Sequence, residues 1–459
     1  MPSRLSAKVK LGFGVGDLGG NLFFTIMGFY LLFYLTDVVH LPAALAGTAL
    51  MIGKIWDAVT DPAVGYLSDH THTRWGRRRP YIFAGAILLF ISMVVVFTDP
   101  GIASNALLFG YMTVMYCVLN TAYTLVNIPY GALTPELTED FNERTLLNGY
   151  RMTFAVAGTF VGASVVLPLV GLAPGAAGWT LMGAVTGAVM LVSSLITFYT
   201  VKEGQTHPVY KSDNIFRSYR SALRMKPFLT ALFPWALHIT GVNIIQAALL
   251  YYFRNIYGNE GGFQIALPIL LGSAIIFIPI WVRISRAIGK RASYNIGMSI
   301  VAVSVIVFFF FGHILGMTFA FVVMFVAGIG ISTNYVMPFS IVPDVVEYDY
   351  AEHGVRREGV FYGMWTFVSK IGQAVGIAAS GWILSIFGYQ APLASGVLPQ
   401  QTELAKLGIR ILTGPLPALF FIAGILILRH YPITAQTYEQ IQEKIRARGL
   451  SQPAQGNEL

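Results

Sequence analysis

The sequence predicts an all-α protein that crosses a membrane many times. Of its 459 residues, 55% are hydrophobic and only 11% are charged. A soluble chain of this length needs about twice that charged fraction to cover its surface. Apolar stretches of roughly 20 residues, the length that crosses a bilayer as a helix, recur along the chain. Basic residues gather between alternate stretches, so the net charge of +8 indicates membrane topology and gives no reason to expect a nucleic-acid partner.

Twelve apolar stretches are long enough to span a bilayer. They cover residues 11–36, 42–69, 81–98, 106–134, 147–169, 178–200, 227–254, 264–285, 294–312, 317–342, 359–388 and 407–429. Lys and Arg accumulate in short cytoplasmic loops, and most of the 30 basic residues fall in such loops if the N-terminus is inside. We therefore expect a multi-pass protein of the inner or plasma membrane with both termini in the cytoplasm.

A hydrophilic stretch divides the spans into two sets of six. The predicted parts are a six-helix bundle over residues 1–200, a cytoplasmic linker over 201–226, a second six-helix bundle over 227–430 and a cytoplasmic tail over 431–459. Short basic loops follow the second and the eighth span, as a duplicated six-helix unit predicts. Two such halves with a site between them are the architecture of alternating-access secondary transporters. The hydrophilic segments are too short for an enzymatic domain.

Two carboxylates lie inside the second predicted span. An ionised group in hydrocarbon costs several kcal/mol unless it is partnered, so its default interpretation is a site on an ion or substrate path. Asp57 and Asp61 are one helical turn apart, and their oxygens can converge on one cation. Lys54 shares this face. The alternative is a structural cluster in which Lys54 neutralises Asp57, but the second acid favours a cation site.

Polar side chains also follow helical periods on the fourth and eleventh spans. The fourth carries Tyr116, Asn120, Tyr123, Asn127 and Tyr130 on one stripe, with Thr124 beside it; the eleventh carries Thr366, Ser369, Lys370 and Gln373, with Trp365 adjacent. Such stripes can line a water-filled cavity, and the alternative for each hydroxyl or amide is a contact between helices. Lys370 could instead pair with a structural acid, and Arg151 could snorkel to the interface. We expect His238 to be a satisfied packing histidine.

Aromatic rings beside amides, hydroxyls and a few charges suit a sugar as the ligand. A sugar has C–H faces that lie on Trp or Tyr rings and hydroxyls that pair with Asp, Asn, Arg or Lys. An acidic sugar would use Lys370 and Arg151 more heavily. Most aromatic residues here have the plainer roles of core packing and interfacial anchoring.

Several motifs together resemble one family. They are Gly14-Val-Gly-Asp17, Tyr34-Leu-Thr-Asp37, Lys54-Ile-Trp-Asp57-Ala-Val-Thr-Asp61-Pro62, Arg74-Trp-Gly-Arg77, Asn127-Ile-Pro-Tyr130, Ile341-Val-Pro-Asp344-Val-Val-Glu347-Tyr-Asp349 and Lys370. Over all twelve spans the sequence is similar to the glycoside-pentoside-hexuronide:cation symporters of the major facilitator superfamily. This resemblance implies symport of a sugar, glycoside or hexuronide by alternating access, coupled to Na⁺, H⁺ or Li⁺ and without another cofactor.

The resemblance also implies site residues. The cation-binding residues would be Asp57, Asp61, Thr124 and Asn127, with Asp57 and Asp61 as metal ligands if the cation is Na⁺; the substrate-binding residues would be Asp17, Tyr123, Asn127, Arg151 and Lys370, to which we add Trp365. Asn127 and Gly131 stand where the best-known family member has an aspartate and a tryptophan. The amide removes one negative charge, so the choice of cation stays open, and the glycine widens the pocket.

The basic loop after the second span has two interpretations. Asp69, Arg74 and Arg77 could form salt bridges that close the cytoplasmic side, or the arginines could determine topology alone. For the whole protein, a same-fold carrier of a lysophospholipid is the nearest alternative, followed by a membrane-embedded glycosyltransferase and a non-transporting receptor. The expected partners are a small sugar and membrane lipid, and the expected working unit is a monomer.

Overall fold

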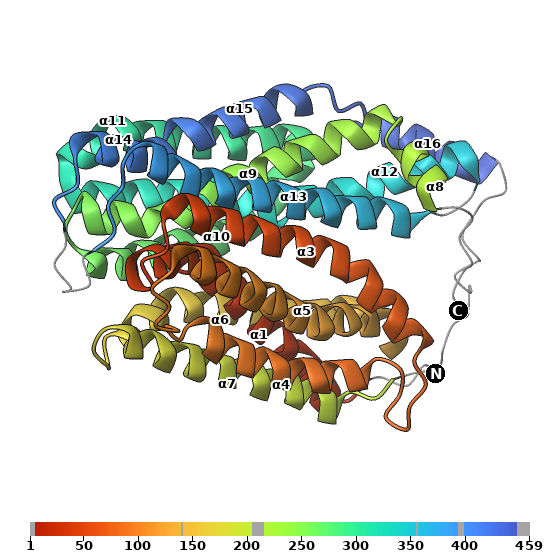
Figure 1. The fold of residues 1–459 in the computed structure, drawn as a ribbon. Helices are drawn as coiled ribbons and strands as arrows, with labels where there is room; N and C mark the ends of the chain where they lie inside the picture. The colour runs from red at the N-terminus through yellow and green to blue at the C-terminus, as the bar shows by residue number, and fades with distance from the viewer. Residues whose placement is uncertain (1–4, 139–140, 204–214, 355–356, 393–398, 448–459) are drawn as a thin grey trace. The chain divides into compact units, whose positions relative to one another are not determined.

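The computed structural model describes residues 5–138, 141–203, 215–354, 357–392 and 399–447. In these residues every regular element is a helix, and no strand occurs. Figure 1 shows the helices, which are α1 (Ala7–Phe29), α2 (Leu31–Phe33), η1 (Tyr34–Val38), α3 (Ala43–His70), α4 (Arg79–Val96), α5 (Asn105–Leu137), α6 (Phe141–Val170), α7 (Ala176–Thr200), α8 (Ile215–Ala222), α9 (Lys226–Asn255), α10 (Glu260–Ile288), α11 (Lys290–Ile331), η2 (Ser332–Tyr335), α12 (Met337–His353), α13 (Glu358–Ile386), α14 (Glu403–Leu412), α15 (Pro415–Leu428) and α16 (Ala435–Ala447).

Every predicted span falls on one or more of these helices. In the described part of the chain, nine helices are long and apolar enough to cross a membrane, or ten if the bent pair Ala7–Phe29 and Leu31–Val38 is one span. One of the nine, Lys290–His353, contains two predicted spans, which meet near Gly316. The φ of Gly316 is +76°, a conformation that disfavours residues with a side chain. The all-helical membrane fold is confirmed, and twelve spans are consistent with it.

The chain divides into two compact units. The first contains residues 1–209, 243–268 and 373–413; the second contains residues 210–242, 269–372 and 414–459. Helices α9, α10 and α13 therefore contribute residues to both. The predicted bundles over 1–200 and 227–430 stay predictions. Residues 204–214 of the predicted linker and 448–459 of the predicted tail lie outside the described residues.

Glycines set the helix packing of the first unit. α1 packs along α6 and α7, while α5 packs along α3 and α4 (Figure 1). A Cβ added to Gly158 of α6 would lie 2.2 Å from the carbonyl oxygen of Leu18 on α1. Only a glycine allows this approach, which brings Asp17 within reach of α6. Phe13, Tyr130 and Phe198 belong to a core cluster that fills the space between these helices.

The second unit has a separate core, and the chain's last described helix packs on it. α11 lies along α15, and α12 lies along α16. Ile441 and Ile445 of α16 are buried in a cluster that also contains Trp281 and Met337. Glu347 of α12 accepts hydrogen bonds from Tyr438 and Gln442 of α16. The described part of the predicted tail is therefore a docked helix.

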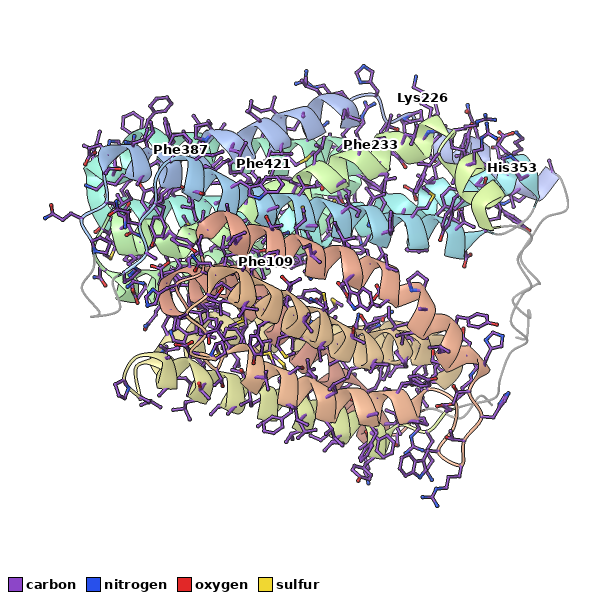
Figure 2. All side chains as sticks on the ribbon, viewed as in Figure 1. Phe109, Lys226, Phe233, His353, Phe387 and Phe421 are labelled. Carbon is purple, nitrogen blue, oxygen red and sulfur yellow. The ribbon has the colours of Figure 1, made fainter. Side chains whose placement is uncertain are left out.

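His238 of α9 is a packing residue, as expected, but it is not a satisfied one. It is fully buried, and its ring centre lies 5.1 Å from that of Phe421 and 5.7 Å from that of Tyr294. Phe421 lies on α15, as Figure 2 shows. Neither ring nitrogen of His238 has a hydrogen-bond partner among the described residues. The sequence prediction was wrong on this point because the facing residues are hydrocarbon and aromatic groups.

Candidate functional site

Helices α3 and α5 run in the same direction and keep one register. A Cβ on Gly53 would lie 2.1 Å from the Tyr116 ring, and one on Gly65 would lie 3.7 Å from Ile128. Gly53 and Gly65 are as far apart in sequence on α3 as Tyr116 and Ile128 are on α5, so the two helices are parallel and in constant register. Asp61 is therefore level with Thr124 along the pair, and Asp57 is one turn before it, as the sequence spacing predicts.

Thr124 joins the two acids. Its Oγ1 lies 3.1 Å from Oδ1 of Asp57 and 3.1 Å from Oδ1 of Asp61. A hydroxyl has one hydrogen to donate, so it cannot satisfy two ionised carboxylates at once. A cation between the oxygens would make both contacts favourable. The two Oδ1 atoms and Thr124 Oγ1 thus form a site that can hold one positive charge.

Lys54 completes this group, which we call the acid cluster: Lys54, Asp57, Asp61 and Thr124. Lys54 Nζ lies 3.7 Å from Asp57 Oδ2 and 5.6 Å from the centre of the Phe24 ring. Lys54, Asp57 and Thr124 are each at most 3% exposed, and Asp61 is half-buried. Lys54 therefore pairs with Asp57, as the structural alternative predicts, and Asp61 lies one turn further along the same helix.

Asn127 is not joined to the acid cluster by any contact that the structure shows. It is half-buried on α5, three residues after Thr124. No hydrogen bond links its side chain to another described residue. Its predicted roles in cation and sugar binding stay predictions.

Asp17 of α1 and Arg151 of α6 form an ion pair. Arg151 Nε donates to Asp17 Oδ2 at 2.5 Å, and Nη2 lies 3.4 Å from Oδ1. The Tyr130 hydroxyl lies 3.0 Å from Asp17 Oδ2 and 2.7 Å from the carbonyl oxygen of Phe13, so it can donate to either. Side-chain exposures of 12% for Asp17 and 21% for Arg151 leave the rim of the pair accessible. The guanidinium is thus directed at a carboxylate on a neighbouring helix, and the snorkelling alternative for Arg151 stays open.

Aromatic rings surround this pair. The Arg151 guanidinium lies 5.7 Å from the centre of the Phe13 ring and 5.1 Å from that of Tyr130. Tyr123 is 5% exposed and stacks on Phe23, with ring centres 4.3 Å apart. A Cβ on Gly20 would lie 3.5 Å from the Tyr123 hydroxyl oxygen. Three predicted sugar contacts, Asp17, Tyr123 and Arg151, therefore come from three neighbouring helices of the first unit.

Trp365 and Lys370 belong to the second unit. Trp365 is 4% exposed and stacks on Trp235, with ring centres 5.6 Å apart and ring planes 10° apart. The Trp235 indole donates to Ser369, whereas the Trp365 indole nitrogen has no hydrogen-bond partner among the described residues. Lys370 is half-buried on α13. A stacked pair of indoles with a spare N–H donor is compatible with the predicted sugar contact.

Comparison with known proteins decides the family. Residues 12–435 match the family described as MFS/sugar transport protein. The chain belongs to this family. Its members are membrane transporters, and the expected resemblance to the glycoside-pentoside-hexuronide:cation symporters is confirmed.

Relatives of this MFS/sugar transport protein cover nearly the whole chain. The glucuronide carrier protein homolog of Escherichia coli K12 is 29% identical over 97% of this chain and 96% of its own length. The isoprimeverose transporter of Lactiplantibacillus pentosus is 29% identical over 83% and 81%. The sodium-dependent lysophosphatidylcholine symporter 1 of Xenopus tropicalis is 24% identical over 96% and 90%. The nucleoside transporter NupG has the same fold, with a TM-score of 0.63, 12% identity and coverage of 92% and 98%.

In this MFS/sugar transport protein the basic loop has a partner that sequence reasoning missed. Glu203, just beyond α7, accepts the backbone N–H groups of Arg77, Arg78 and Arg79 at 2.8, 2.7 and 2.9 Å. These groups begin α4 and have no partner within the helix, and a carboxylate also suits the helix dipole there.

Asp69 of the predicted latch pairs with Arg78, at 3.0 Å. Arg78 was not among the predicted latch residues. Arg74 is exposed, lies over the Trp75 ring at 5.4 Å and forms no salt bridge with a described residue. The sequence does not show which arginine of the loop pairs with Asp69. Arg78 does so because it lies between α3 and α5, where it also donates to the carbonyl oxygen of Ala132. The closing role of Asp69, Arg74 and Arg77 stays a prediction.

Another buried ion pair of the first unit involves η1, which follows α1 and α2 in the chain. Asp37 of η1 accepts hydrogen bonds from Arg254 at 3.1 Å, from Tyr389 at 2.6 Å and from Thr36 at 2.6 Å. Its side chain is fully buried. Asp37 is predicted only as part of a motif, because its partners Arg254 and Tyr389 are more than 200 residues away in the chain.

Proposed function

We propose that this protein is a secondary active transporter that couples the symport of a sugar, glycoside or hexuronide to a cation. The observation that carries the proposal is the convergence of Asp57 and Asp61 on one hydroxyl, Thr124 Oγ1, in a buried part of the first unit. Two carboxylates that share one hydroxyl supply oxygens that can hold a positive charge between them and release it again.

The acid cluster is our proposed cation site. Carboxylate and hydroxyl oxygens are the ligands that hard cations prefer, and Asp57, Asp61 and Thr124 supply them. Lys54 pairs with Asp57, and a bound cation or proton would add positive charge beside both carboxylates. Loss of that charge at low dielectric would disfavour rearrangement of the empty site.

The Asp17–Arg151 pair is our proposed sugar site. The carboxylate accepts hydrogen bonds from sugar hydroxyls, and the guanidinium donates to them. A hexuronide would add its own carboxylate, which pairs with Arg151 in the bidentate geometry that guanidinium groups favour. The hydroxyl group of Tyr123 offers a further hydrogen-bond partner for a sugar hydroxyl. The similarity to a glucuronide carrier homolog and to an isoprimeverose transporter supports this class of substrate.

Helix α5 connects the two proposed sites. Its Thr124 contacts both acids of the cation site, and its Tyr130 lies within hydrogen-bond distance of Asp17 of the sugar site. A cation that fixes Thr124 therefore also restricts Tyr130, so each ligand raises the affinity of the other by the same factor. We further propose that both termini lie in the cytoplasm and that the monomer is the working unit.

A lysophospholipid is the second candidate substrate. The similarity to a sodium-dependent lysophosphatidylcholine symporter favours it, and Arg151 could hold a phosphate group. The match is lower in identity than those to the two sugar carriers.

Uptake into membrane vesicles tests the proposal. Labelled glucuronide, isoprimeverose and lysophosphatidylcholine would be offered with an imposed Na⁺ gradient, an imposed H⁺ gradient or neither. We expect one sugar to accumulate above its external concentration in one gradient, and an ionophore that collapses the gradient to abolish this. Sugar uptake that is equal with and without both gradients would contradict symport, and uptake of the lipid alone would establish the second candidate.

A further inference from the structure

Asn120 of α5 has a buried oxygen without a partner. Its side chain is fully buried, and its Oδ1 accepts no hydrogen bond from any described residue. Its Nδ2 donates to the carbonyl oxygen of Tyr116 at 2.9 Å. Because a carbonyl oxygen requires a donor, this bond establishes which end of the amide is nitrogen. A buried carbonyl left unpaired costs about 1–3 kcal/mol, so the position calls for a partner that none of the described residues supplies.

The register of α3 and α5 places Asn120 beside the acid cluster. One turn before it, Tyr116 meets Gly53; one turn after it, Thr124 contacts Asp57 and Asp61. Asn120 therefore lies on the face of α5 that packs against α3, at the level of Asp57.

We propose that Asn120 Oδ1 is a ligand of the coupling cation and that this cation is an alkali-metal ion such as Na⁺. The inference rests on the proposed symport and names its cation. A proton occupies one carboxylate and needs no further oxygen. An alkali-metal ion exchanges its hydration shell for several protein oxygens, and neutral carbonyl dipoles are suitable replacements. Asn120 adds such an oxygen to those of Asp57, Asp61 and Thr124 without adding a charge.

Asn120 also accounts for how the cation site can be complete with an amide, and not a carboxylate, at position 127. The family resemblance implies a carboxylate there, and its replacement removes a charge from the expected site. Asn120 lies seven residues, or about two turns, before Asn127 on the same helix, at the level of Asp57. The neutral oxygen that completes the metal shell therefore comes from position 120, while two carboxylates remain to attract the ion.

Cation-dependent unfolding of the purified full-length protein tests the proposal. The melting temperature would be measured in detergent over a series of NaCl and LiCl concentrations, with choline chloride keeping ionic strength constant. The informative variant is Asn120→Leu, which keeps the volume and removes the oxygen, compared with Asn120→Asp, which keeps an oxygen. Asn255→Leu is the matched control, because Asn255 also donates to the carbonyl four residues earlier, at 2.9 Å.

We expect Na⁺ to raise the melting temperature of the natural protein and of Asn255→Leu with the same half-saturating concentration. Asn120→Leu should need at least about tenfold more Na⁺, which corresponds to about 1.4 kcal/mol of binding. Asn120→Asp should retain the response. Half-saturation of Asn120→Leu within about twofold of the natural protein, or no effect of Na⁺ or Li⁺ on the natural protein, would overturn the proposal.

The same variants in vesicles separate this inference from the proposed function. If an H⁺ gradient drives sugar accumulation and a Na⁺ gradient does not, symport stands and the assignment of Asn120 fails. If no sugar accumulates in either gradient while Na⁺ still raises the melting temperature through Asn120, the cation site stands and the transport of sugar fails.

Discussion

Arg151 donates to Asp17 across 2.5 Å, joining α6 to α1. In the sequence, these residues are predicted to be two separate sugar contacts. In the folded protein they are one unit, so neither can be changed without altering the other. A sugar hydroxyl that binds there meets an acceptor and a donor at the same time, which suits a pair of neighbouring hydroxyls.

Arg151→Gln should abolish sugar binding and lower stability. Removing one partner of a largely buried ion pair costs about 3–5 kcal/mol, because the other charge is left without compensation. Sugar binding would be measured by protection against unfolding at increasing sugar concentration. The matched control is Lys10→Gln, since Lys10 pairs with Glu143 at 2.8 Å between the same two helices. Loss of stability in both variants, but loss of sugar binding only at Arg151, is the expected pattern; equal loss of binding would contradict the sugar site.

Arg254→Ala should destabilise the protein more than any exposed ion-pair variant. Asp37 is fully buried and would keep only Thr36 and Tyr389 as donors, so a cost of about 3–5 kcal/mol is expected. Lys406→Ala is the control, because its pair with Glu403 is exposed and should contribute at most about 1 kcal/mol. Thermal unfolding checks both. Equal melting temperatures for the two variants would show that the Asp37–Arg254 pair is not a stabilising contact.

Glu203→Gln should weaken the start of α4. The carboxylate accepts three backbone N–H groups, and a neutral amide gives weaker bonds to the same donors. Hydrogen exchange at residues 77–79 should become faster in this variant. The control Arg74→Gln should leave exchange unchanged, because Arg74 is exposed and takes no part in these bonds. Unchanged exchange in Glu203→Gln would contradict the capping role.

Docking of α16 should depend on a neutral Tyr438. Burial, helped by the Glu347 carboxylate, raises the pKa of Tyr438 above its usual value of 10.0. A raised folded-state pKa means that the stabilisation is complete below about pH 10 and is lost as pH rises further. Protease protection of α16 should therefore be constant from pH 6 to about 9 and decline above 10. Tyr438→Phe should show weaker protection and lack this decline, whereas an identical pH profile would exclude Tyr438 as the cause.

The sequence predicts the helices well because their signal is local. Apolar length alone identifies the spans, and the one-turn spacing of Asp57 and Asp61 is enough to predict that both reach one partner. That partner, Thr124, is identified through the family resemblance. Tyr130 appears on the polar stripe of α5 but not among the predicted site residues, since nothing in the stripe says which member faces α1.

Contacts between distant segments are not predictable in the same way. Glu203 and Arg254 are ordinary polar residues in sequence, and only the packing of α7 beside α4, and of α9 near η1, gives them partners. For His238 the sequence predicts hydrogen-bond partners, but its ring faces Phe421 and Tyr294, which provide none. Which polar residues meet is determined by helix register, and register comes from glycines such as Gly53 and Gly158.

The most direct test of the account is ion-driven accumulation of sugar by Asp57→Cys in vesicles. The thiol removes one of the two carboxylates that meet at Thr124, so no cation can be held in balance with Lys54. We expect accumulation above the external concentration to be lost, while exchange of sugar across the membrane, which needs no net cation movement, is partly retained. The exposed acid Asp99, changed to Asn, should leave accumulation intact. Normal uphill accumulation by Asp57→Cys would contradict the central claim that this buried acid holds the coupling ion.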